Sequence, residues 1–175
     1  PTLRDVYLPP FRAAVQAGVG TLMAAFVDLN GMPASANRYL LTDILRGEWG
    51  FEGFVVSDWE SVKELVEHGV AEDEADAARL ALLAGLDMDM VSGVYLNHLA
   101  RLLNDGRISR DVLDQAVLRV LRIKARAGLF DQPFTDPQRP ARDLLTPSAR
   151  QLARRLATSS MVLLKNRAGL LPLEG

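Results

Sequence analysis

Three short polar segments of this 175-residue chain follow apolar runs of strand length, and each contains carboxylates that could do chemistry. They are Asp28 to Asn30, Ser57 to Trp59, and Asp87 to Asp89. In parallel α/β folds, reactive side chains gather where the strands end. Asp58 is the most informative, because Trp59 follows it directly. A carboxylate can attack or stabilise an anomeric carbon while an indole covers the apolar face of a pyranose, so this pair favours sugar chemistry.

The same segment also has a purely structural interpretation. Ser57 and Glu60, three residues later, have the spacing of a helix-capping box. Asp58 would then simply favour the positive end of the dipole of the following helix. Spacing alone leaves both interpretations open.

The other candidate motifs favour structure over chemistry. His68 and His98 lie thirty residues apart and lack metal-ligand spacing, so we expect helix-end or surface histidines. Gly18-Val19-Gly20 lacks the third glycine and the preceding strand of a dinucleotide loop. Residues 104–109 resemble the turn of a helix-turn-helix, which is the best non-enzymatic alternative. We expect neither a metal nor a cofactor.

Hydrophobic periodicity and turn residues predict the elements that position these segments. The expected helices are residues 4–18, 38–48, 59–67, 73–84, 95–104, 109–127 and 148–159. The expected strands are residues 22–27, 53–57, 86–91 and 161–165. Their alternation indicates βα units and a parallel sheet with helices outside it. Four prolines within residues 131–147 indicate a linker.

Length and composition limit what the chain can be. It is 49% hydrophobic and 24% charged, as in an ordinary globular domain. A net charge of −2 offers no general attraction to nucleic acid, and no apolar run reaches the ~18 residues of a membrane span. The absence of cysteine excludes disulfides and thiolate catalysis. A complete (β/α)8 barrel needs roughly 250 residues, and the chain begins at Pro1, so we interpret it as part of a longer protein.

Several motifs, in order, resemble the family 3 glycoside hydrolases, the β-glucosidase group, and most closely its bacterial periplasmic branch. In the first half of the chain they are Asn30-Gly-Met-Pro33, Asn37-Arg-Tyr-Leu-Leu41, Leu45-Arg-Gly-Glu-Trp-Gly-Phe51 and Gly53-Phe-Val-Val-Ser-Asp-Trp59. Later in the chain they are Ala84-Gly-Leu-Asp-Met-Asp-Met90, Arg122-Ile-Lys124, Gly128-Leu-Phe130, Val162-Leu-Leu-Lys-Asn166 and Leu171-Pro172. The likeness covers essentially the whole chain.

The resemblance implies an α/β fold in three parts. Residues 1–128 would form the C-terminal half of a TIM-like (β/α)8 barrel, which is the catalytic domain. Residues 129–147 would be a linker, and residues 148–175 would begin an α/β sandwich domain. Barrels without this second domain also occur in the family, but residues 162–166 continue past the linker and argue against that branch.

The resemblance also implies roles for three site residues. Asp58 matches the catalytic nucleophile of the Ser-Asp-Trp motif, and Trp59 matches the neighbouring residue that lines the sugar subsite. Phe26 stands where many members have a tyrosine that touches the substrate and steadies the nucleophile. Because Phe26 lacks the hydroxyl group, that hydrogen bond is in doubt and the residue offers an aromatic wall.

The implied activity is hydrolysis of terminal β-D-glycosidic bonds with retention of configuration. Two carboxyl groups ~5–5.5 Å apart act in turn, one as nucleophile and one as acid/base. The acid/base would lie outside this chain, so we expect the isolated piece to be inactive. The expected partner is a small β-linked oligosaccharide or glycoside, in the periplasm or outside the cell. The alternatives are a β-xylosidase or another β-glycosidase of the family, or a non-catalytic carbohydrate-binding relative.

Overall fold

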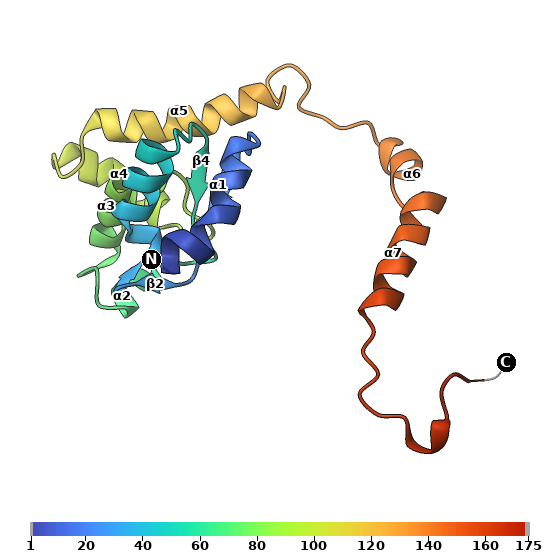
Figure 1. Cartoon of the computed structure of the whole chain (residues 1–175). Helices are drawn as coiled ribbons and strands as arrows, with labels where there is room; N and C mark the ends of the chain where they lie inside the picture. The colour runs from blue at the N-terminus through green and yellow to red at the C-terminus, as the bar shows by residue number, and fades with distance from the viewer. Residues whose placement is uncertain (1, 174–175) are drawn as a thin grey trace. The chain divides into compact units, whose positions relative to one another are not determined.

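The computed structural model describes residues 2–173, which form two compact units with their boundary between Asp131 and Gln132 (Figure 1). The first unit contains η1 (Leu3–Tyr7), α1 (Leu8–Gln16), β1 (Thr21–Met23), β2 (Asp28–Leu29), β3 (Met32–Pro33), η2 (Ala34–Ala36), η3 (Tyr39–Glu48), β4 (Phe54–Val56), α2 (Glu64–Glu67), α3 (Glu74–Ala84), α4 (Val94–Asn104) and α5 (Arg110–Arg126). The second unit contains α6 (Arg139–Asp143), α7 (Pro147–Ser160) and the 3-10 turn η4 (Arg167–Gly169).

A small parallel sheet organises the first unit. Strands β1 and β4 pair in parallel, with Leu22 opposite Val55, and the helical segment η3 connects them. A single parallel bridge from Val56 to Met88 adds the segment after α3 to the other edge of β4. The predicted α/β class with parallel strands is therefore confirmed. The strand expected at residues 22–27 is shorter, because the chain turns at Asn30-Gly31 into the hairpin of β2 and β3.

Local sequence signals fix the ends of the longer helices. Asp73 caps α3 by accepting a hydrogen bond from the amide of Asp76 at 2.7 Å. The helix ends at Gly85, which has a φ of 107°. Ser109 caps α5 in the same way through the amide of Val112. These helices lie close to their expected positions.

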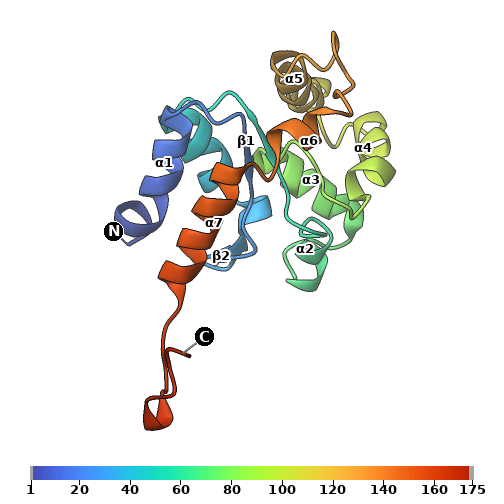
Figure 2. The same ribbon diagram turned by 90° about the vertical axis from the view of Figure 1, so that its right-hand side faces the viewer.

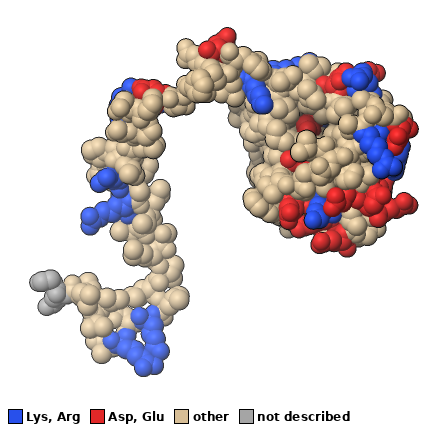
Figure 3. Space-filling view, turned by 180° about the vertical axis from the view of Figure 1, so that it is seen from behind, with Lys and Arg blue, Asp and Glu red and all other residues tan. Residues whose placement is uncertain are grey.

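The core lies between the sheet and the helices. Its most deeply buried side chains come from several elements: Ile44, Val55, Val62, Leu65, Leu86, Val94 and Leu102. In both views α1 lies on one side of the paired strands, and α3 and α4 lie on the other (Figure 1; Figure 2). The visible face of the first unit carries acidic and basic side chains together (Figure 3).

Three further expected elements differ from the structure. The strand expected at residues 86–91 is reduced to the single bridge at Met88. The helix expected at residues 59–67 begins only at Glu64, because Glu60 has a left-handed φ of 55° and its amide donates to the carbonyl of Met90 instead of to a preceding turn. Residues 161–165 form no strand. Met161 to Leu164 are 63–91% exposed, and no strand among the described residues of the second unit is available to pair with them.

Candidate active site

The site residues predicted from the sequence follow the C-terminal ends of two neighbouring parallel strands. They are Phe26, Asp58 and Trp59. Met23, the last residue of β1, lies opposite Val56, the last residue of β4. Phe26 comes three residues after Met23, and Asp58 comes two residues after Val56. The same edge of the sheet therefore presents Phe26, Asp58 and Trp59.

The two carboxylate oxygens of Asp58 differ in their surroundings. Oδ1 accepts a hydrogen bond from the backbone amide of Trp59 at 2.7 Å. Among residues 2–173, Oδ2 has no hydrogen-bond partner. The side chain is partly buried, while Trp59 and Phe26 are 58% and 53% exposed. One oxygen is thus fixed, the other is open for reaction, and two exposed aromatic side chains lie at the same sheet edge.

The structure rejects the helix-capping interpretation of Ser57 and Asp58. No helix begins here, since α2 starts at Glu64 and Glu60 has a left-handed φ of 55°. The Ser57 hydroxyl instead accepts a hydrogen bond from the amide of Met90 at 2.7 Å. A following helix therefore explains neither the position of Asp58 nor its hydrogen bond to the amide of Trp59.

The other carboxylates at this edge have structural partners. Asp28 lies 3.7 Å from Nδ1 of His68, and both side chains are largely exposed. Asp89 accepts hydrogen bonds from the Ser92 hydroxyl and the amide of Tyr95, so it holds the first turn of α4. Asp58 thus differs from Asp89 because one of its oxygens has no hydrogen-bond partner among residues 2–173, and from Asp28 because its other oxygen is fixed by a backbone amide.

Asp87 forms a buried ion-pair network that sequence reasoning missed. One oxygen lies 2.5 Å from the Arg46 guanidinium and 2.8 Å from the amide of Val55, and the other accepts from Arg119 at 2.9 Å. The Asp87 side chain is 1% exposed. Burial raises the pKa of the Asp87 carboxyl, and the two guanidinium groups oppose that increase. The network joins η3, β4 and α5 beneath the sheet edge.

The histidines do not form a metal site. His68 ends α2, and His98 on α4 lies 3.4 Å from Glu74. No group of three or more histidine, aspartate or glutamate side chains in the described part of the chain is arranged to hold a metal ion. Likewise, no helix between residues 2 and 173 has the length and apolar character to cross a membrane.

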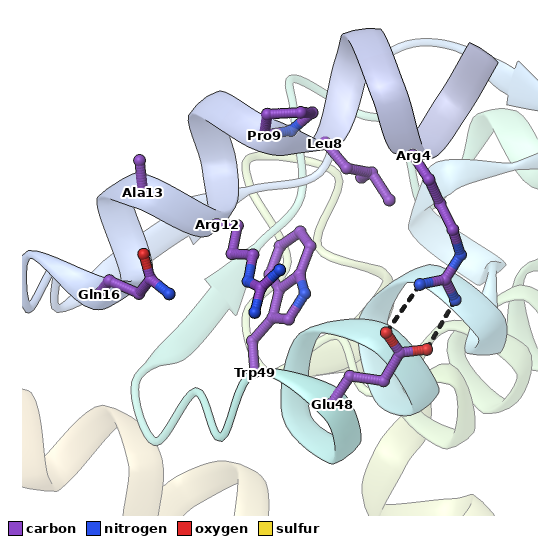
Figure 4. Close-up of a pocket in the computed structure, with 8 residues that line it drawn as sticks. All are labelled: Arg4, Leu8, Pro9, Arg12, Ala13, Gln16, Glu48 and Trp49. Atoms are coloured by element: carbon purple, nitrogen blue, oxygen red, sulfur yellow. Dashed lines mark hydrogen bonds and ion pairs between the residues drawn. The ribbon is translucent and has the colours of Figure 1, made fainter. Parts of the chain in front are cut away.

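Two cavities lie away from Asp58. One, of about 550 Å³, lies between α1 and the end of η3 (Figure 4). There the Arg4 guanidinium donates two hydrogen bonds, of 2.6 and 2.8 Å, to the two carboxylate oxygens of Glu48. Arg4 and Glu48 are thereby paired and nearly half exposed, whereas Arg12, which also lines the cavity, has no ion-pair partner among residues 2–173. The other, of about 590 Å³, is lined mainly by apolar side chains of α1, β1 and η3. Neither cavity is lined by Asp58.

Comparison with known proteins identifies the family. The sequence model described as glycosyl hydrolase family 3 N terminal domain matches residues 1–123. The chain belongs to this family. The resemblance found in the sequence motifs is confirmed.

Individual relatives narrow the comparison. The chain is 43% identical over 173 residues to a periplasmic β-glucosidase of Salmonella typhimurium, covering 96% of this chain and 23% of the relative. It is 42% identical over 181 residues to a β-xylosidase of Formosa agariphila, covering 98% of this chain and 25% of the relative. The structure superposes on the β-glucosidase from Listeria innocua in complex with glucose with a TM-score of 0.87, at 41% identity, covering 98% of this chain and 24% of that one. The chain thus spans about a quarter of the length of these relatives.

Proposed function

We propose that this chain is part of a longer β-glycosidase that hydrolyses terminal β-D-glycosidic bonds with retention of configuration. The main support is the environment of Asp58. This carboxylate follows the end of a strand, and one of its oxygens accepts a hydrogen bond from a backbone amide while the other is open. Family membership and relatives described as β-glucosidases and β-xylosidases support the reaction class. In this proposal residues 1–128 are the C-terminal half of a TIM-like barrel, 129–147 a linker, and 148–175 the start of a sandwich domain.

The mechanism assigns one role to each site residue. An oxygen of Asp58 attacks the anomeric carbon while a carboxylic acid outside this chain protonates the departing oxygen, and the glycosidic C–O bond breaks. The acid/base is now a carboxylate. It takes a proton from water, and the water oxygen displaces Asp58 from the anomeric carbon. Trp59 covers one face of the sugar ring, and Phe26 supplies a wall without a hydroxyl group.

The proposed substrate is a small β-linked oligosaccharide or glycoside. A relative bound to glucose supports a glucoside, and the similar identity to a β-xylosidase supports a xyloside as the second candidate. The relative described as periplasmic supports a location in the periplasm or outside the cell. Comparing kcat/KM for aryl β-glucoside and aryl β-xyloside would separate the two substrates.

Trapping of the covalent intermediate tests the nucleophile. The full-length protein is incubated with a 2-fluoro β-glycoside, digested, and analysed by mass spectrometry, and the label is expected on Asp58. Asp58→Asn should lower kcat by roughly 10⁴-fold or more. Asp28→Asn is the matched control, because Asp28 is an exposed strand-end carboxylate paired with His68, and it should change kcat less than about threefold. A label on another residue would refute the assignment.

The isolated chain provides a second test. Because the acid/base is assigned to another part of the protein, residues 1–175 alone should show no turnover of an aryl β-glucoside. Robust turnover that disappears in Asp58→Asn would show that the second carboxyl group lies within this chain.

A further inference from the structure

The backbone of Met90 contacts the chain on both sides of Asp58 and Trp59. Its amide donates to the Ser57 hydroxyl at 2.7 Å, and its carbonyl oxygen accepts from the amide of Glu60 at 3.1 Å. Asp58 and Trp59 are the two residues enclosed between these contacts. The backbone of one residue from the neighbouring segment therefore fixes the turn that presents the candidate nucleophile.

Ser57 connects this contact directly to Asp58. Its hydroxyl group donates to the backbone carbonyl of Asp58 at 2.8 Å while it accepts from Met90. The residue is 0% exposed, so water cannot replace either hydrogen bond. The segment after α3 is joined to β4 by the bridge from Met88 to Val56 and by the amides of Asp87 and Met88, which donate to the carbonyl of Val55. The Ser57 hydroxyl adds the next connection along the chain.

Backbone conformation supports a constrained turn. Glu60 and Val91 have φ values of 55° and 70°, in the left-handed region. This region is unfavourable for residues other than glycine, and especially for a β-branched residue such as valine. Such conformations persist only where the surroundings enforce them, and they concentrate at functional sites. Here they flank the two Met90 contacts.

We propose that Ser57 is a positioning residue for the nucleophile. The proposal rests on the proposed function, because it assumes that Asp58 attacks the sugar. The Ser57 hydroxyl holds the Asp58 peptide against Met90, so that the carboxylate points at the anomeric carbon. Loss of the hydroxyl allows the turn to move, and a displacement of about 1 Å can slow a reaction by roughly 100-fold. Because Ser57 is fully buried, its hydroxyl should not contact the substrate, and affinity should be retained.

The experiment separates attack from binding. The full-length protein and its Ser57→Ala variant are incubated with a 2-fluoro β-glucoside, and covalent labelling of Asp58 is followed with time. The expected result is a labelling rate constant reduced by about 10- to 100-fold, with the dissociation constant of the inhibitor changed less than about threefold. A residue needed only for folding would lower the amount of active protein without changing this rate constant.

Thr42→Val is the matched control. The Thr42 hydroxyl is partly buried and donates a 2.7 Å hydrogen bond to the Ala84 carbonyl, so the variant loses a comparable hydroxyl contact at a place that has no hydrogen bond to residues 57–61. It should label at the wild-type rate. If Ser57→Ala does not fold, Ser57→Cys, whose larger thiol fills the space but hydrogen bonds weakly, takes its place with the same expected direction.

Two results would overturn the proposal. Labelling of the folded Ser57 variant at the wild-type rate would remove the positioning role while leaving Asp58 as nucleophile. An equal loss of rate in Thr42→Val would show a general effect of losing an internal hydroxyl group. If the wild-type protein is labelled elsewhere or not at all, the proposed function fails first, and this outcome is visible without any variant.

Discussion

Replacement of Asp87 by alanine should destabilise the first unit more than any surface change. The carboxylate is 1% exposed and accepts hydrogen bonds from Arg46, Arg119 and the amide of Val55. Asp87→Ala leaves two guanidinium groups, with side chains 13% and 23% exposed, without their counter-ion. Breaking a buried pair from one side costs about 3–5 kcal/mol. The equilibrium constant for opening should therefore rise by about 10²- to 10⁴-fold.

Hydrogen exchange measures this change locally within the full-length protein. Amides of residues 53–57 that exchange through opening of the domain should exchange faster by the same factor. Asp111→Ala is the control, because Asp111 is an exposed aspartate in the first turn of α5. Its loss should cost at most about 1 kcal/mol. An Asp87→Ala variant that exchanges like Asp111→Ala would refute the assigned energy of the network.

Two further changes test other features. Burial disfavours ionisation of Asp76, but hydrogen bonds from Arg79 and a backbone amide outweigh it and hold the pKa of Asp76 below its usual range. Asp76→Asn should therefore cost about 1–3 kcal/mol at neutral pH. Its difference from wild type in thermal melting should shrink as the pH falls below about 4, and a constant difference would contradict this. Gly53→Ala places a methyl group against the backbone oxygen of Gly20 and 2.6 Å from the Phe51 ring. In thermal melting, this variant should be less stable by about 1–3 kcal/mol or more. Gly47→Ala is the control, because its methyl group would lie 3.5 Å from the nearest atom, and it should be neutral or slightly stabilising.

Local sequence signals predicted most of the helices and the strand before Asp58. The apolar run at residues 53–57 followed by a polar pair correctly placed Asp58 at a strand end, and Asp73 and Ser109 correctly marked helix starts. These features depend on residues a few positions apart. They are therefore visible in the sequence without knowledge of the fold.

The errors involve partners that are distant in the sequence. Ser57 and Glu60 have capping-box spacing, but the Ser57 hydroxyl bonds to Met90, 33 residues away, and the helix does not start there. Asp87 looked like a strand-end carboxylate, yet Arg46 and Arg119 lie 41 and 32 residues from it and bury its charge. Spacing cannot reveal such contacts, because they depend on how the elements pack.

The exposed apolar side chains at Met161 to Leu164 have a practical consequence for purification. A short, exposed segment of aliphatic residues that pairs with no strand is a template for strand pairing between molecules. Concentrated solutions of residues 1–175 would therefore self-associate through this segment. Expression of residues 1–131 alone, or of a longer chain that continues into the proposed sandwich domain, would avoid leaving these side chains uncovered.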